Sequence, residues 1–220
     1  MVQPYYERDG ITIYHGDCQE VLPTLVTAEI DLVCTDPPYG MDWDGKVTRG
    51  PNGSGKRGAT RNYGVTIQGD TEKFDPSPWL AFPRAIFWGF QHFNDAVPNG
   101  TVLVWVKRYD SGFGSFLSDA DTAWMKGGHG VYCFRDLSLQ AESSNRAHPT
   151  QKPVPLMKWC ISKSGSTTGV VLNPFMGSGT TLRAAKDLGR RAIGIELEER
   201  FCEIAAKRLQ QEVLALGGVA

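Results

Sequence analysis

Four consecutive residues, Asp36-Pro37-Pro38-Tyr39, combine a carboxylate, two rigid prolines and an aromatic ring. Prolines lack an N–H group and drive the preceding residue out of the helical region, so neither a helix nor a strand continues through them. The Asp36 carboxylate and the Pro37 carbonyl are then two fixed acceptors for the two hydrogens of an exocyclic amine, while Tyr39 offers a stacking face. The tetrad predicts a site for an aromatic amine, such as N6 of adenine or N4 of cytosine. An ordinary Asp-Pro turn is the alternative.

A second candidate site is the glycine-rich turn Gly177-Ser178-Gly179, which follows an apolar run and opens a helix. Glycines let the backbone approach a ligand closely, and a helix N-terminus presents free N–H groups. About twenty residues further on, Glu196 ends the next strand, where a carboxylate can accept hydrogen bonds from a ribose diol. The turn lacks both the lysine of a phosphate-binding loop and the third glycine of a dinucleotide fingerprint. It therefore favours an adenosine cofactor without phosphate, such as S-adenosyl-L-methionine; a tight turn beside a solvated glutamate is the alternative.

Together the two motifs predict methyl transfer to an amine. Hydrogen bonds from the amine to Asp36 and to the Pro37 carbonyl would aim the nitrogen lone pair at the methyl group on sulfur. Transfer of this kind is driven mainly by positioning and electrostatics. Because the nitrogen becomes acidic only after alkylation, either Asp36 or water would accept the proton late.

Alternating strand and helix patterns must position these motifs. The patterns predict strands at residues 10–14, 30–34, 101–106, 131–134, 170–172 and 192–195, and helices at residues 18–25, 78–96, 153–163, 180–188 and about 198–216. Continuously apolar strands between helices are typical of a parallel sheet covered on both faces. We expect an α/β fold, a doubly wound, mostly parallel, Rossmann-like sheet. Ligands of such sheets bind beyond the carboxyl ends of the strands, where both motifs fall.

The composition favours one folded domain spanning residues 1–220. The chain is 41% apolar and 21% charged, and its length suffices for a single core. No apolar run approaches the roughly 20 residues of a membrane span, and the charged N-terminus predicts no signal peptide. The five cysteines form no CxxC pair, which predicts reduced thiols in the cytoplasm. The four histidines lack metal-binding spacing, so we expect no metal site.

The net charge of −1 does not mark a nucleic-acid binder, but the bases are unevenly distributed. Residues 45–69 contain seven glycines, no acid and five bases, which are Lys46, Arg49, Lys56, Arg57 and Arg61. Because this segment follows Tyr39 almost directly, we expect a mobile basic loop that contacts DNA phosphates around a flipped base. A solvated loop without a partner is the alternative.

Three blocks make the chain similar to the amino-group DNA methyltransferases, the adenine-N6 and cytosine-N4 enzymes. The first is Gly16-Asp17 with the tetrad, the second is HPTQKP at residues 148–153, and the third is NPFMGSGTT at residues 173–181 with IGIE at residues 193–196. The tetrad precedes the cofactor motif, which resembles the permuted beta group of that family.

The resemblance implies a role for each matched residue. The tetrad would hold the target amine and stack the base. The implied cofactor-binding residues are Asp17, Asp36, Pro37, Thr150, Lys152, Phe175, Gly177, Ser178, Gly179, Thr180 and Glu196. Among them Glu196 would bind the ribose, and Lys152 would lie near the cofactor carboxylate. Without the resemblance, Asp17 would be interpreted as a helix N-cap and Lys152 as a solvated surface lysine.

Family usage of aspartate at the head of the tetrad favours N6 of adenine in DNA as the target. The alternatives are N4 of cytosine, an RNA or protein-amide acceptor, and a binding module without activity; Asp36 in place of asparagine counts against the amide. Only residues 107–147 are available for a target-recognition segment, so we expect no separate recognition domain. Sequence specificity would then be short or relaxed, or a second subunit of a homodimer would contribute to it.

Overall fold

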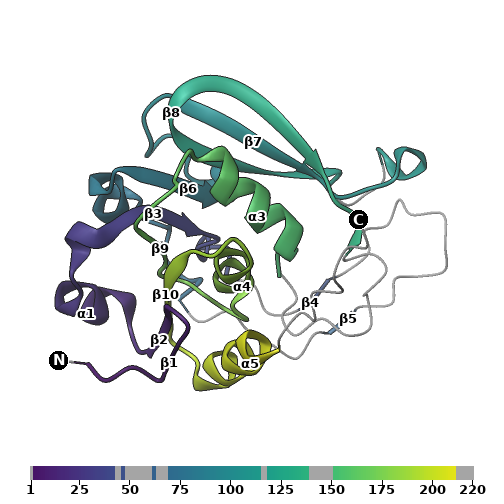
Figure 1. The fold of residues 1–220 in the computed structure, drawn as a ribbon. Coiled ribbons are helices and arrows are strands. Elements are labelled where there is room, and N and C mark those ends of the chain that lie inside the picture. Colours follow the sequence, from purple (N-terminus) through teal and green to yellow (C-terminus); the bar gives the residue numbers. More distant parts are fainter. Residues whose placement is uncertain are drawn as a thin grey trace, which may run out of the picture.

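The computed structural model describes residues 2–42, 46–47, 61–62, 69–114, 118–138 and 151–211 (Figure 1). Its strands are β1 (Tyr6–Arg8), β2 (Ile11–His15), β3 (Ile30–Thr35), β4 (Lys46–Val47), β5 (Arg61–Asn62), β6 (Arg84–Trp88), β7 (Gly100–Val106), β8 (Ala120–Arg135), β9 (Val170–Asn173) and β10 (Arg191–Glu196). Its α-helices are α1 (Cys18–Val21), α3 (Val154–Lys163), α4 (Thr180–Asp187) and α5 (Glu199–Gln210), and its 3-10 turns are η1 (Leu22–Thr24), η2 (Thr27–Glu29), η3 (Ser77–Ala81), η4 (Phe90–His92) and η5 (Asp110–Gly112).

Eight of the strands form one sheet in the order β1-β2-β10-β9-β3-β6-β8-β7. The five strands β2, β10, β9, β3 and β6 are mutually parallel, while β1 pairs antiparallel with β2 at one edge. The predicted α/β class with a mostly parallel sheet is therefore confirmed. None of the helices within the described residues has the length and apolar character needed to cross a bilayer.

Strand β8 bends around β7. Its first arm, residues 120–126, pairs with β6 and runs opposite to β7, whereas its second arm, residues 131–135, pairs with β7 in the same direction. Gly127 and Gly128 lie between the arms with φ of +82° and +66°, values that favour glycine and allow the reversal. The sequence pattern predicted only the second arm as a strand.

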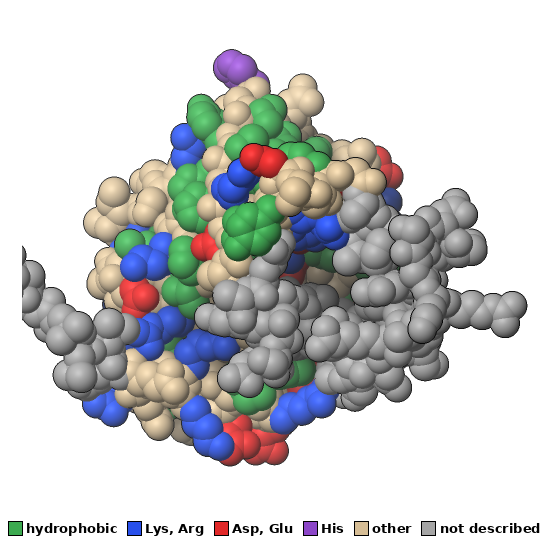
Figure 2. All heavy atoms as spheres, turned by 90° about the vertical axis from the view of Figure 1, so that its right-hand side faces the viewer, with side chains coloured by type: hydrophobic (Ala, Val, Ile, Leu, Met, Phe, Trp, Pro, Cys, Tyr) green, Lys and Arg blue, Asp and Glu red, His purple; other side chains and the backbone are tan. Residues whose placement is uncertain are grey.

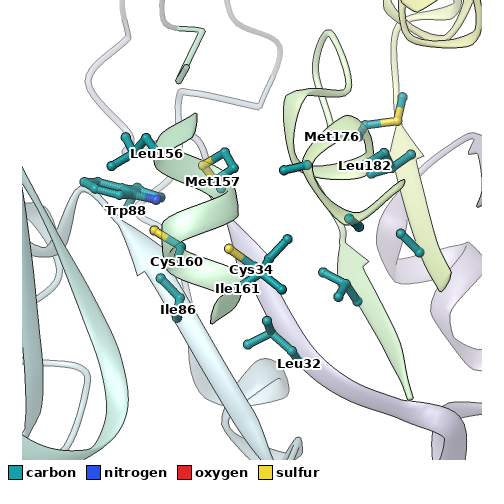
Figure 3. Close-up of a cluster of buried hydrophobic side chains, with 14 of the residues drawn as sticks. Leu32, Cys34, Ile86, Trp88, Leu156, Met157, Cys160, Ile161, Met176 and Leu182 are labelled. Carbon is teal, nitrogen blue, oxygen red and sulfur yellow. The ribbon is translucent and has the colours of Figure 1, made fainter. Parts of the chain in front are cut away.

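Alternation of side chains along the central strands explains why both faces of the sheet are covered. One face packs against α3, α4 and α5 (Figure 3) through Leu32, Cys34, Ile86, Trp88, Leu156, Met157, Cys160, Leu182, Cys202 and Ala205. The other face packs against α1, η3 and η4 through Val21, Val33, Trp79, Ala85, Phe87, Phe93 and Leu172. The second covering layer is thus built from short turns rather than long helices.

The prediction of a helix over residues 78–96 is wrong. This stretch contains η3, then strand β6, then η4. Pro83 would remove a hydrogen bond from a continuous helix. The residues after it, Ala85 to Trp88, are fully buried between β3 and β8, and a strand buried on both faces has the same continuous apolar sequence as a buried helix. Similarly, the helix predicted at residues 18–25 ends at Val21, because Pro23 converts the continuation to the 3-10 turn η1.

Candidate active site at the carboxyl edge of the sheet

The two sequence motifs follow neighbouring strands. Asp36 comes directly after β3, and the glycine-rich turn comes after β9, which pairs with β3. The Asn173 side chain joins these strand ends: its Oδ1 accepts from Thr35 Oγ1 at 2.7 Å, and its Nδ2 donates to Thr181 Oγ1 on α4 at 2.9 Å. Asn173 is only 3% exposed. Asn173 belongs to the motif at residues 173–181, but the sequence predicted no role for its side chain.

A single pocket contains side chains from both motifs. It is lined by Asp36, Gln151, Lys152, Met157, Asn173, Phe175, Met176, Gly177, Ser178, Thr180 and Thr181. Six of the residues proposed to contact the cofactor are in this lining, whereas Asp17, Pro37, Gly179 and Glu196 are outside it. The structure thus brings the acidic head of the tetrad and the glycine-rich turn to one cavity.

Both carboxylate oxygens of Asp36 have protein partners. The Tyr39 hydroxyl donates to Oδ1, and Lys152 Nζ donates to Oδ2 at 2.7 Å. Lys152 is 8% exposed, and its ammonium lies 5.6 Å from the centre of the Trp88 ring. The interpretation of Lys152 as a solvated surface lysine is therefore wrong.

The Tyr39 ring is fixed by stacking on a neighbouring side chain. It stacks on His92 of η4, with ring centres 4.6 Å apart and planes 14° from parallel. Burial, and then the negative charge of Asp36, raise the pKa of the Tyr39 hydroxyl well above its usual value. The hydroxyl therefore stays protonated and donates to Asp36. Because residues 78–96 were predicted to be helical, sequence reasoning missed His92 in this position.

Asp70 fixes the backbone that follows the tetrad. Its Oδ1 accepts from the backbone N–H groups of Tyr39 and Gly40, both at 2.8 Å, and from that of Met41 at 3.3 Å. Asp70 is 3% exposed. A buried carboxylate that binds successive N–H groups makes a stiff turn. No sequence signal distinguished Asp70 from the other acids of the chain.

The Glu196 carboxylate supports the glycine-rich turn from β10. Its Oε2 accepts from Gly177 N at 2.7 Å, and its Oε1 accepts from Glu198 N at 2.9 Å at the start of α5. Burial raises the pKa of Glu196 above its ordinary value, although these backbone hydrogen bonds oppose the shift. Glu196 is thus not the solvated glutamate of the alternative interpretation.

Asp17 lies one strand away, where β2 pairs with β10. Its side chain accepts from Gln19 N at 2.8 Å, so Asp17 is the N-cap of α1. The neighbouring Gly16 N donates to the Glu196 carbonyl at 2.9 Å, which places the Gly16-Asp17 block beside the end of β10.

Several predicted site residues lie outside the described residues. These are Thr150, Arg49, Lys56 and Arg57, together with the side chains of Lys46 and Arg61. The backbone of Lys46–Val47 pairs antiparallel with that of Arg61–Asn62 as β4 and β5. The basic segment therefore contains a short strand pair that the sequence did not predict.

Comparisons with known proteins agree with this geometry. The DNA methylase family (N6_N4_Mtase) matches residues 120–207. Along 97% of its length the chain is 26% identical to the type II methyltransferase M.ScaI of Streptomyces caespitosus, covering 86% of that protein. The chain is therefore similar in sequence to amino-group DNA methyltransferases. Over 91% of its length the chain is 29% identical to the type II methyltransferase M.HinfI of Haemophilus influenzae, covering 68% of that protein.

Solved structures share the fold. The PvuII DNA methyltransferase, titled cytosine-N4-specific, matches 97% of the chain at a TM-score of 0.60 and 17% identity, and the match covers 91% of the PvuII chain. The M1.HpyAVI–SAM complex matches 91% with its whole chain at a TM-score of 0.55 and 22% identity. The architecture of the sheet is thus shared with a solved DNA methyltransferase and with a protein solved in complex with SAM.

An arginine on α5 holds the glycine-rich turn in place. Arg208 donates to the Ser178 carbonyl, to Ser178 Oγ at 3.0 Å and to Gln151 Oε1 at 3.0 Å. Ser178 Oγ also donates to Gln151 Oε1 at 2.9 Å. Arg208 therefore connects the turn to the segment that carries Lys152, and sequence reasoning assigned no role to Arg208 or Gln151.

We expect Arg208→Met to weaken binding of S-adenosylhomocysteine about tenfold, because hydrogen bonds to charged groups contribute about 1.5–3 kcal/mol. Isothermal titration calorimetry measures this, and KM for the cofactor should rise more than kcat falls. The matched control is Arg200→Met on the same helix, since Arg200 pairs with Glu198 at 2.6 Å and is 49% exposed. Equal affinities for the two variants would show that Arg208 does not position the turn.

Proposed function

We propose that the chain transfers the methyl group of S-adenosyl-L-methionine to the exocyclic N6 amine of adenine in DNA. The observation that carries this proposal is the shared pocket, where Asp36 and the Gly177 turn face one cavity. Adenine is favoured by aspartate at the head of the tetrad. Relatives named type II methyltransferases support DNA as the substrate, and we infer from those names a role in restriction–modification.

The residues of the pocket fit this cofactor. A Cβ built on Gly177 would meet no atom within 4 Å, so the turn borders open space where a ligand can approach the backbone. Lys152 supplies a cation for a carboxylate. Glu196, which is outside the lining but binds the Gly177 N–H, would supply a carboxylate for ribose hydroxyls. When bound, the cofactor supplies a methyl group on a positively charged sulfur.

The tetrad would orient the acceptor. Asp36 and the Pro37 carbonyl accept hydrogen bonds from the amine, and Tyr39 presents its ring to the base. Because Asp36 is 20% exposed and lies beside the buried Lys152, its hydrogen bonds form in a partly desolvated place, where they are stronger than in water. Stacking on an aromatic ring returns about 1–3 kcal/mol of the cost of flipping the base.

The basic segment at residues 45–69 would bind DNA phosphates beside the flipped base. It follows the tetrad closely in the sequence, and β4 lies within it together with β5. Lysine and arginine side chains are distributed over the described part of the face that Figure 2 shows. These observations support a DNA-binding role for Lys46, Arg49, Lys56, Arg57 and Arg61.

Replacing Lys56, Arg57 and Arg61 with glutamine is expected to weaken DNA binding evenly across sequences. Each lost phosphate contact lowers the slope of log K against log salt by about 0.9, so the slope should flatten by about 2–3. Fluorescence anisotropy of labelled duplexes at several salt concentrations measures this slope. An unchanged slope would show that these side chains are not on the phosphates.

The same proposal extends to organisation. We infer a single methyltransferase domain over residues 1–220, without a separate recognition domain. We infer in addition a homodimer in which a second subunit contributes to recognition. We also infer a cytoplasmic location. The five cysteines are all free, and burial raises the pKa of Cys34 to about 12, in keeping with reduced thiols.

The decisive experiment incubates the protein with isotopically labelled S-adenosylmethionine and mixed-sequence DNA, followed by mass analysis of the nucleosides. We expect labelled N6-methyladenine. Labelled N4-methylcytosine would instead support the alternative, N4 of cytosine. Label in neither nucleoside would contradict methyl transfer to DNA. RNA of the same sequences is the parallel substrate, and sequencing of modified sites gives the recognised sequence.

A further inference from the structure

An ion pair occupies the acceptor that the target base needs. Lys152 Nζ lies 2.7 Å from Asp36 Oδ2, and the Tyr39 hydroxyl donates to Asp36 Oδ1. Each oxygen of the Asp36 carboxylate therefore already accepts one hydrogen bond within the protein. An incoming amine competes with these two donors for the same oxygens.

Lys152 is the donor that a ligand can remove. It lines the pocket together with Gly177, Ser178 and Thr180, and it is the one lysine or arginine among the described residues of that lining. The Tyr39 hydroxyl, in contrast, belongs to a ring fixed against His92 and is not part of the lining. A negatively charged group entering the pocket therefore meets Lys152.

We propose that Lys152 exchanges partners, pairing with Asp36 in the free protein and with the carboxylate of the cofactor in the loaded protein. The exchange frees Asp36 Oδ2 for the amine of the target base. This inference rests on the proposed function and adds to it a coupling between its two substrates. Lys152 acts here as a positioning residue, since it controls the acceptor rather than the reacting atoms.

The exchange has a thermodynamic consequence. Asp36 competes with the cofactor for Lys152, so the ion pair lowers cofactor affinity until a target amine takes its place on Asp36. Cofactor and target base then strengthen each other's binding by the same factor, because such coupling is reciprocal.

The test measures binding of S-adenosylhomocysteine without DNA by calorimetry. This product has no positive charge on sulfur, so loss of attraction between that charge and Asp36 does not obscure the result. Asp36→Asn removes the competitor and should bind S-adenosylhomocysteine roughly 5–50-fold more tightly than the natural chain, within the usual range of coupling between sites. Asp36→Ser removes the same charge in a smaller side chain and should behave likewise.

Lys152→Met should bind S-adenosylhomocysteine more weakly than the natural chain. The double variant, with Asp36→Asn and Lys152→Met together, should bind no more tightly than Lys152→Met alone. Removing Asp36 raises the affinity only by making Lys152 available to the ligand. If Asp36→Asn raises the affinity equally in the natural chain and in Lys152→Met, the exchange is overturned. Equal or weaker binding by both Asp36 variants would overturn it as well.

Two controls separate the exchange from other effects. Asp121→Asn breaks a matched pair, since Asp121 lies 2.5 Å from Lys107 and the two side chains are 25% and 29% exposed; its affinity should not change. 5′-Methylthioadenosine lacks the carboxylate, so Asp36→Asn should bind it as the natural chain does. If the natural chain binds neither S-adenosylhomocysteine nor 5′-methylthioadenosine, the proposed function fails. That outcome is distinguishable from failure of the exchange alone.

Discussion

Asp36→Ala is expected to lower the rate of methyl transfer about 1,000-fold or more, since removing one preorganised hydrogen-bonding group typically costs 10²–10³ in kcat. The variant loses the acceptor that orients the amine, while Asn173 and Thr35 still join β3 to β9. Its fold should therefore persist, and its affinity for S-adenosylhomocysteine should rise as it does in the other Asp36 variants. Single-turnover rates with labelled cofactor measure the first effect, and calorimetry measures the second.

Asp121→Ala is the control for this prediction, because Asp121 is an ion-paired acid on β8 that does not line the pocket. It should transfer methyl groups at close to the natural rate. Full activity in Asp36→Ala would remove Asp36 from the chemistry, and a parallel loss of cofactor binding would assign it a structural role instead.

Gly89→Ala is expected to reduce kcat about 100-fold, because misplacing a positioning group by about 1 Å costs a factor of that order. A Cβ on Gly89 would lie 2.0 Å from Tyr39 Cε1, a distance at which the ring must move. Movement of the ring would also alter the hydrogen bond from its hydroxyl to Asp36. Steady-state kinetics on duplex DNA measure the change.

Backbone strain must be separated from this clash, because Gly89 has φ of +80°. Gly165→Ala offers the comparison: Gly165 has φ of +69°, and a Cβ there would meet no atom within 4 Å. Both variants should lose about 1–2 kcal/mol of stability from the left-handed backbone, measured by thermal unfolding. Activity should fall in Gly89→Ala only, and an equal fall in both would show that the position of Tyr39 is unimportant.

The sequence predicted the sheet and the positions of both motifs because these depend on local patterns. Continuous apolar runs followed by Pro37 or by Gly177 indicate strand ends, and parallel strands end at a common edge. The prediction failed where two structures share one pattern. Buried β6 has the apolar run of a buried helix, so Trp88 and His92 were not placed beside the tetrad.

Pairings across the chain could not be predicted from spacing. Lys152 and Asp36 are 116 positions apart, and their ion pair depends on where the segment before α3 meets the sheet. Arg208 reaches Ser178 for the same reason, from a helix whose sequence shows only an amphipathic pattern. Asp70 accepts hydrogen bonds from backbone N–H groups, which every residue except proline has. The residue types of its partners therefore give no sequence signal for this contact.

The amide of Asn173 gives the molecule a lateral connection between its two working parts. Through Thr35 on one side and Thr181 on the other, it sets how far the acceptor stands from the donor, independently of the loops that join them. The distance between them is therefore set by a contact between segments that are 138 positions apart in the sequence.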